Sequence, residues 1–143
     1  MEYIDYELED IENIRNSFEL IIDECILSLK DEIRKLIKER WLKGESVDGG
    51  SIGEYLSSTY KKLKLNKNPK ARGRVDLTLT GSLGNEIDIV RRNNGDYEII
   101  SNDSKYNSIG SKYGFKEFGL TKEQDELINT LVFMKIENKL INL

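Results

Sequence analysis

Three features of this 143-residue sequence predict an α+β fold. Apolar residues recur at helical spacing near the N-terminus, apolar and polar residues alternate around an Asn-Gly pair in the middle, and a capped helical pattern closes the chain. The length suits one domain, 1–143, with one hydrophobic core. We therefore expect a long N-terminal helix, a projecting loop or arm, a small antiparallel sheet with an Asn-Gly hairpin, and a C-terminal helix packed on the sheet.

The first predicted element is one amphipathic helix over residues 9–43. Its apolar residues step by three and four positions, and no Gly or Pro precedes Gly44, which is a plausible C-cap. Residues 1–24 carry a net charge of −8, whereas residues 30–43 carry +3. This polarity has two explanations, namely complementarity to the helix dipole together with solubility, or contact between the acidic end of one subunit and the basic segment of a neighbour.

Residues 44–74 are expected to be a flexible Gly- and Ser-rich loop followed by an exposed basic arm. The arm has seven cations and no acid, and Pro69 favours extended geometry at Asn68. The cations are Lys61, Lys62, Lys64, Lys67, Lys70, Arg72 and Arg74. Such an arm fits an anionic partner, either a DNA backbone or an acidic protein surface, although a solvated loop without a partner has the same composition.

Antiparallel strands are expected within residues 75–101. Residues 75–80 alternate apolar and polar side chains, and the strand candidates 86–90 and 97–100 flank Asn94-Gly95, a pair typical of hairpin turns. Residues 102–120 are predicted to be a loop with one short helical turn near 106–113.

A last helix is predicted over residues 121–140. Thr121 and Gln124 have the spacing of a capping box. The apolar surface that follows is broader than one core-facing stripe, which indicates that part of it is buried against another chain.

The composition argues against most catalytic and metal-binding classes. The chain has no His and one cysteine, Cys25, which we interpret as a buried small hydrophobe rather than a reactive thiol. The net charge of −4 is unlike that of a dedicated nucleic-acid binder, and we find no signal peptide and no membrane span. A carboxylate enzyme would have to use Asp76, Glu86 or Asp88, which alternation places on the solvated face of strands. We expect no enzyme activity, no cofactor and no metal, and a protein that works by contact.

Several stretches resemble a family of tailed-phage neck and tail-completion proteins, also called virion morphogenesis or head-tail connector proteins. The matching stretches cover roughly residues 40–140 and are Trp41-Leu42-Lys43-Gly44, Asp48 to Tyr55, Tyr60 to Lys64, Val75 to Leu83, Lys112-Tyr113-Gly114 and Phe118 to Thr121. The most specific is Leu79-Thr80-Gly81-Ser82-Leu83. The family-motif residues are Gly53, Tyr55, Leu79, Thr80, Gly81, Leu83 and Gly119.

The resemblance implies a structural virion protein, assembled in the host cytoplasm, that forms a sixfold or twelvefold homo-oligomeric ring in the neck or upper tail. Its implied partners are portal or adaptor proteins and tail proteins, with possible contact to packaged DNA and none to a membrane. Within such a ring, the Gly-rich stretch from Gly44 to Tyr55 could adjust as neighbouring rings dock. The alternative is a nucleic-acid-associated oligomeric binding protein that uses the basic arm 61–74.

Overall fold

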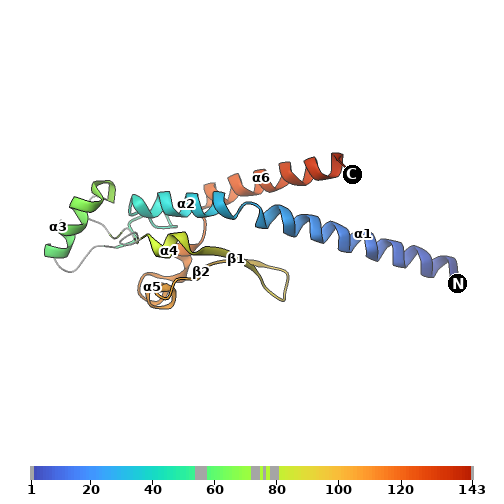
Figure 1. Cartoon of the computed structure of the whole chain (residues 1–143), viewed down its shortest axis with the longest axis horizontal. Coiled ribbons are helices and arrows are strands. Elements are labelled where there is room, and N and C mark those ends of the chain that lie inside the picture. Colours follow the sequence, from blue (N-terminus) through green and yellow to red (C-terminus); the bar gives the residue numbers. More distant parts are fainter. Residues whose placement is uncertain (1, 54–57, 72–74, 76, 78–80, 143) are drawn as a thin grey trace. The chain divides into compact units, whose positions relative to one another are not determined.

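The computed structural model describes residues 2–53, 58–71, 75, 77 and 81–142, with side chains placed from Leu8 onward apart from those of residues 58–61 and 71 (Figure 1). The predicted α+β class is confirmed. Along the sequence, a small antiparallel sheet lies between helices near the N-terminus and a helix at the C-terminus. The helices are α1 (Glu2–Leu27), α2 (Lys30–Leu42), α3 (Ser58–Lys67), α4 (Ser82–Asn85), α5 (Tyr106–Tyr113) and α6 (Lys122–Ile141). Two 3₁₀ turns are η1 (Pro69–Ala71) and η2 (Phe115–Phe118).

The chain forms two compact units, whereas its length predicts one domain. The first unit contains Met1–Leu29 and Leu127–Leu143, and the second contains Lys30–Glu126. In the first unit, Lys139 of α6 forms an ion pair with Glu24 of α1, and Cys25, Leu29 and Ile128 are buried. The expected burial of Cys25 is therefore confirmed.

The single helix predicted over residues 9–43 is wrong, because the chain leaves helical geometry at Ser28 and Leu29. The Ser28 hydroxyl donates to the Cys25 carbonyl (2.7 Å), and the Leu29 amide donates to the Ile26 carbonyl, one residue closer than in an α-helix. A new helix then begins with Asp31 and Glu32 in its first turn, where acids complement the helix dipole.

The extended basic arm is also wrong for the described part of that segment, since residues 58–67 form α3. No Gly or Pro interrupts this stretch, and Lys and Leu are good helix formers. Pro69 acts only at the end of the helix, where Asn68 leaves it and donates through Nδ2 to the Leu42 carbonyl (2.6 Å). Asn68 therefore attaches the end of α3 to the end of α2.

The strand predicted at 75–80 lies mostly outside the described residues. Of its members, Val75 is buried outside any strand, and Leu77 has a φ of +54°, which a β-strand does not permit. Helix α4 begins at Ser82, after Gly81 in the left-handed conformation (φ +74°).

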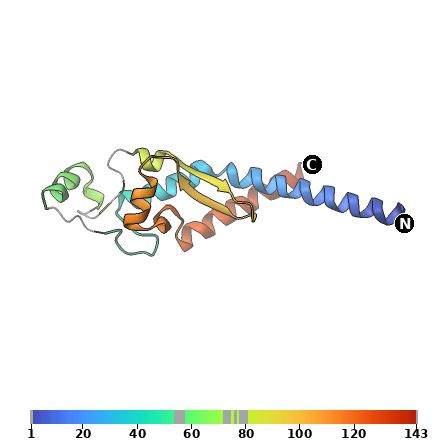
Figure 2. The same cartoon turned by 90° about the horizontal axis from the view of Figure 1, so that it is seen from below.

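The Asn-Gly hairpin is confirmed (Figure 2). Strands β1 (Ile87–Arg91) and β2 (Tyr97–Ser101) pair antiparallel with Ile89 opposite Ile99. The turn closes through the Arg92 amide, which donates to the Asp96 carbonyl (2.7 Å), and Gly95 has a φ of +88°. Only Gly95 of the Asn-Gly pair uses the left-handed region, as in hairpin loops that end on a glycine.

The core of the second unit forms where α2 packs on β1 and α4, and η2 packs on β2 and α5. Its largest buried side chain is Trp41, whose ring meets Phe118 edge to face at 5.3 Å. Tyr106 of α5, in the predicted helical turn, also packs against Phe118, and the centroids of these two rings are 4.6 Å apart.

The predicted capping box at the start of α6 is confirmed. The Gln124 amide donates to the Thr121 hydroxyl (3.1 Å), and the Thr121 amide donates to the Gln124 side chain (3.0 Å). The helix begins at Lys122 and ends at Ile141, within a residue of the predicted bounds.

Candidate functional site

The predicted basic residues do not form one uniform cationic surface. Lys62, Lys67 and Lys70 are exposed, whereas Lys64 keeps 4% of its surface accessible and has partners within the chain. The side chain of Lys61 and the residues Arg72 and Arg74 lie outside the described part of the chain. Because α3 is a helix, its cations take different directions, and Lys64 is turned inward.

The family-motif residues that the structure describes are packing and turn positions. Gly81 precedes α4 in the left-handed conformation, and Leu83 is buried with its carbonyl accepting from the Ser101 hydroxyl (2.7 Å). The Gly53 carbonyl accepts from the Val75 amide (2.9 Å). Tyr55, Leu79 and Thr80 lie outside the described residues.

Gly119, the last motif residue, belongs to a buried polar cluster that the sequence analysis missed. Arg40 donates through Nη1 to the Gly119 carbonyl (2.9 Å) and to Gln124 Oε1 (2.8 Å), and through Nη2 to the Glu117 carbonyl (2.5 Å). Burial lowers the pKa of Arg40, while the charges of Glu117 and Glu45 act in the opposite direction. The sequence shows Arg40 only as a cation near the end of a helix. Its three acceptors could not be predicted, because they lie more than seventy residues further along the chain.

The Glu117 side chain completes this cluster. Its carboxylate accepts from the Ser46 hydroxyl (2.6 Å) and from the Val47 amide (3.1 Å), and its carbonyl also accepts from Trp41 Nε1 (3.0 Å). The Gly-rich loop after α2 is thereby held against η2. Every polar atom of Glu117 is thus committed to structure, so the arrangement fixes a loop and offers no free acid for chemistry.

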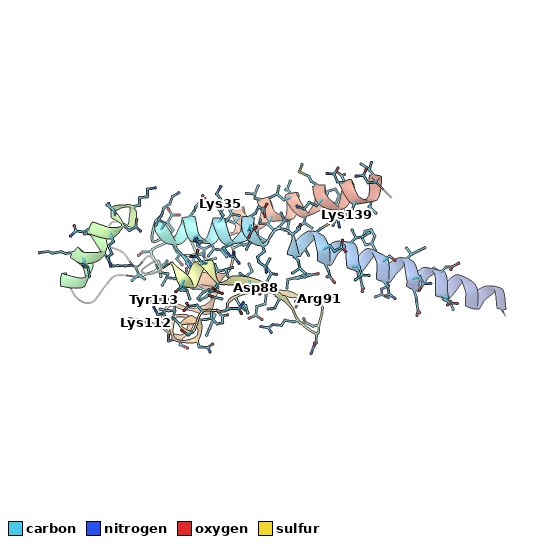
Figure 3. All side chains as sticks on the ribbon, in the orientation of Figure 1. Lys35, Asp88, Arg91, Lys112, Tyr113 and Lys139 are labelled. Carbon is cyan, nitrogen blue, oxygen red and sulfur yellow. The ribbon has the colours of Figure 1, made fainter. Side chains whose placement is uncertain are left out.

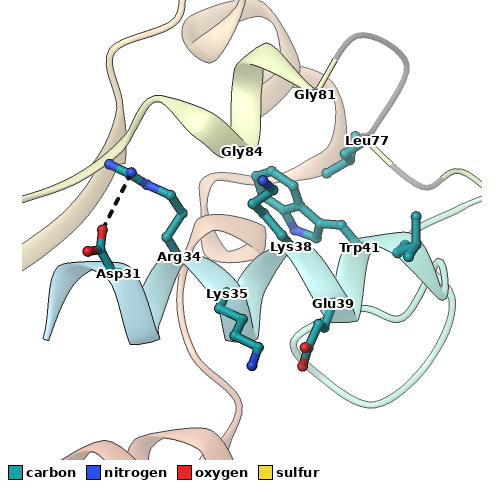
Figure 4. Close-up of a pocket in the computed structure, with 10 residues that line it drawn as sticks. Asp31, Arg34, Lys35, Lys38, Glu39, Trp41, Leu77, Gly81 and Gly84 are labelled. Atoms are coloured by element: carbon teal, nitrogen blue, oxygen red, sulfur yellow. Dashed lines mark ion pairs between the residues drawn. The ribbon is translucent and has the colours of Figure 1, made fainter.

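A groove of about 440 Å³ lies between α2 and α4 (Figure 4). Lys38 and Trp41 lie on the side of α2 that faces α4, and Lys35 and Glu39 are directed away. Lys38 donates to Asn85 Oδ1, and its stem fills the space beside Gly84, where a Cβ would lie 2.8 Å from Lys38 Cγ. Arg34 donates to the Ile87 carbonyl (2.7 Å). The cations Arg34 and Lys38 therefore brace α2 against its neighbours.

The candidate carboxylates do not converge among the described residues. Asp88 forms an ion pair with Lys30 (2.8 Å) and accepts from Asn102 (3.3 Å) (Figure 3). The hydrogen bond from Lys30 is the main reason that the pKa of Asp88 is lowered, so its carboxylate stays charged. Glu86 is exposed, and Asp76 lies outside the described residues. Within that part of the chain, no group of three or more His, Cys, Asp or Glu side chains could hold a metal ion.

The most distinctive surface of the first unit is apolar and exposed. On α1, four exposed apolar residues, which we name the α1 stripe, are Leu8, Ile11, Ile14 and Phe18. On α6, a second set, named the α6 stripe, comprises Leu127, Phe133, Met134, Leu140 and Ile141. Ile14 is 69% exposed, Phe133 65% and Ile141 80%. Single exposed apolar residues are ordinary, but contiguous sets on two helices mark surfaces that associate with other molecules.

We compared the chain with models of protein families, with curated proteins and with solved structures, and none of the three comparisons gave a match. No helix among the described residues is sufficiently long and apolar to cross a membrane.

Proposed function

We propose that this protein is a structural protein of a tailed bacteriophage that forms a ring in the neck or upper tail and joins the portal-side connector to the tail. The observation that carries the proposal is the exposed apolar surface formed by the α1 stripe and the α6 stripe. Exposure of such surfaces to water is unfavourable, and the free energy falls when another chain covers them. The sequence resemblance described above supports a phage neck or upper tail as the assembly in which another chain covers this surface.

The internal architecture of the second unit agrees with a role in contact. Two of its buried charged side chains, Arg40 and Glu117, hold backbone segments together. Two cations that line its groove are hydrogen-bonded within the unit: Lys38 donates to Asn85 of α4, and Arg34 donates to the Ile87 carbonyl of β1. The unit therefore offers a rigid body from which surface residues can engage neighbouring proteins.

The proposal is tested by the mass of the purified full chain in native mass spectrometry and light scattering, alone and with the portal-side and tail components of the same particle. We expect a closed ring, or a monomer that becomes a ring on those components. A chain that remains monomeric and binds neither component overturns the proposal. Antibody labelling of the neck of intact particles gives an independent readout of location.

The alternative is an oligomeric nucleic-acid-binding protein that uses residues 61–74. Its support is the set of exposed cations Lys62, Lys67 and Lys70, which no acid within the segment offsets. Binding through phosphate contacts falls steeply with salt. We therefore expect, under this alternative, duplex DNA binding at low salt that weakens as salt rises.

The matched variants for this alternative use exposed lysines only. A triple Lys62→Glu, Lys67→Glu, Lys70→Glu variant should abolish DNA binding, whereas the control triple Lys35→Glu, Lys105→Glu, Lys122→Glu should keep it. Lys64 is left unchanged because its burial would confuse a binding defect with a folding defect. Absence of binding by the parent protein at low salt, or equal loss in both triples, removes the alternative.

A further inference from the structure

The N-terminal part of α1 is a helix that no described part of its own chain covers. Every side chain from Leu8 to Leu20 is exposed, and in both views this part continues beyond the C-terminal end of α6 (Figures 1 and 2). Isolated helices gain little stability from propensity alone, and most owe their stability to the packing of an apolar face. An amphipathic helix of this length is thus expected to be packed in the functional state.

The α1 stripe has the spacing of a coiled-coil seam. Ile11, Ile14 and Phe18 are separated by three and then four positions, and the same alternation continues through Ile21 to Cys25. Cys25 is buried, whereas the three residues nearer the N-terminus are exposed. Residues at this alternation line one side of a helix and interlock with an equivalent row on another helix. The seam is therefore covered at one end and open at the other.

The charges beside the open part of the seam are complementary to one another. In the heptad frame that places Ile11 at a and Ile14 at d, Asp10 takes position g and Arg15 takes position e. In a parallel pair in register, a residue at g faces the residue five positions later, at e, on the other helix. Asp10 of one copy would meet Arg15 of a second copy. In an antiparallel pair, position e faces e and position g faces g. Arg15 would then face another Arg15, and Asp10 another Asp10.

Arg15 is available for such a pair. Its side chain is 78% exposed, and within its own helix it lies 3.7 Å from Glu19, an exposed pair four residues along that contributes little. Glu9 and Glu12 take positions f and b, on the side of the helix away from the seam. These two acids therefore lie where they do not oppose pairing.

We propose that the α1 stripe docks on the same stripe of a second copy, in parallel and in register, with Asp10 of one copy paired to Arg15 of the next. This inference rests on the proposed function, since a cyclic ring gives every subunit the same orientation to its axis and sets neighbouring helices parallel. Ile11 at a and Ile14 at d, with Leu8 at e widening the seam, favour a bundle of more than two helices.

The first test is charge exchange in the full chain, measured as the association constant by light scattering and native mass spectrometry at low salt. Asp10→Arg and Arg15→Asp should each weaken association roughly threefold or more, since each creates a like-charged pair across the seam. The double variant Asp10→Arg, Arg15→Asp should recover the parent value. Singles that do not change association, or a double variant weaker than both singles, overturn the proposal.

The second test distinguishes association through the seam from nonspecific association of exposed apolar residues. Ile14→Ser should weaken association at least tenfold, whereas Leu20→Ser, equally exposed on the opposite side of the same helix, should leave it unchanged. Both side chains are exposed, so the thermal unfolding of the monomer should be the same in both. Equal effects of the two variants overturn the proposal.

The two proposals fail separately. If the parent protein forms a ring that Ile14→Ser leaves unchanged, the pairing of α1 is wrong while the neck assignment stands. If Ile14→Ser instead loses binding to a tail or portal-side component without any change in self-association, the stripe is occupied by another protein and the pairing is again wrong.

Discussion

Arg40 and Glu117 are two of the charged side chains that are buried in the second unit, and both are held by hydrogen bonds. Arg40 and Glu117 are each almost inaccessible. Both Nη atoms of Arg40 donate to oxygen atoms, whereas its Nε is buried without a hydrogen-bond partner among the described residues. The Glu117 carboxylate accepts from the Ser46 hydroxyl and the Val47 amide. A buried charge is costly unless its hydrogen bonds are made, and removal of one member leaves the others unpaired in a medium that cannot solvate them. This dependence should make the second unit sensitive to substitution of Arg40.

We expect Arg40→Met to lower the free energy of unfolding by about 3 kcal/mol, because three acceptors lose their donor while the side-chain volume is largely kept. Urea unfolding followed by Trp41 fluorescence measures the change, since Trp41 lies in the same cluster. The control is Lys35→Met, an exposed cation on the same helix, with an expected change within about 0.5 kcal/mol. Equal effects of the two variants would contradict the structural role of Arg40.

Asp88 predicts a specific pH dependence. The ion pair with Lys30 lowers the folded-state pKa of Asp88, so the native state favours the charged form more than the unfolded state does. The stability it contributes is present above the ordinary Asp pKa of about 4 and is lost as the pH falls through the lower folded-state value. Thermal unfolding of the parent protein and Asp88→Asn should therefore differ at neutral pH. The difference should shrink as the pH falls below about 4 and disappear once the pH is below the folded-state pKa of Asp88. A difference that persists in acid would contradict the pairing.

The helices and strands are defined by short-range interactions with clear physical causes. The turn at Ser28 divides α1 from α2, Asn68 ends α3, and the left-handed Gly95 closes the hairpin. At the start of α6, Thr121 and Gln124 satisfy each other's backbone amides, and Gln124 also donates to the Leu36 carbonyl (3.2 Å). This cap both starts a helix and attaches its first turn to α2.

We expect Thr121→Ala to lower the free energy of unfolding by about 1 kcal/mol, the ordinary value for a lost N-cap. Thr121→Ser keeps the hydroxyl and should stay close to the parent protein. Gln124→Ala should cost more than Thr121→Ala, because it also removes the acceptor of Arg40. Chemical unfolding followed by circular dichroism measures all three, and the reverse order of effects would show that the cap is a minor part of this junction.

The whole molecule combines buried polar anchoring in one unit with exposed apolar surface in the other. The α1 stripe and the α6 stripe belong to the unit formed by the two ends of the chain, whereas the exposed lysines of α3 and η1 belong to the other unit. Different surfaces for different neighbours are what head-to-tail assembly requires.

The two sides of α6 should respond differently to the same substitution. Phe133→Ser is expected to weaken self-association and to change monomer stability by about 0.5 kcal/mol or less, because the ring is 65% exposed. Ile128→Ser should lower the free energy of unfolding by about 3 kcal/mol, because this side chain is buried. Light scattering and thermal unfolding of both variants separate the effects. If Phe133→Ser destabilises the monomer as strongly, the α6 stripe is part of the core.

Features set by neighbouring residues were predictable from the sequence. The Thr121 and Gln124 cap, the Asn94-Gly95 hairpin and the helical turn at 106–113 each depend on groups within a few positions of one another, so local pattern contains the relevant physics. The apolar periodicity of α1 and the breadth of the apolar surface on α6 are local in the same sense. The α+β class follows from these elements in order.

Features set by distant residues were not predictable. Pattern alone does not show that Lys64 is buried or that Arg40 binds the carbonyls of Glu117 and Gly119, because a side chain's burial depends on what the fold brings beside it. The break at Ser28 likewise competes with a helical pattern that continues across it. The same long-range packing decides which apolar residues of α1 and α6 stay exposed. Local periodicity predicts that a helix has an apolar face, but only the tertiary structure determines whether that face is buried.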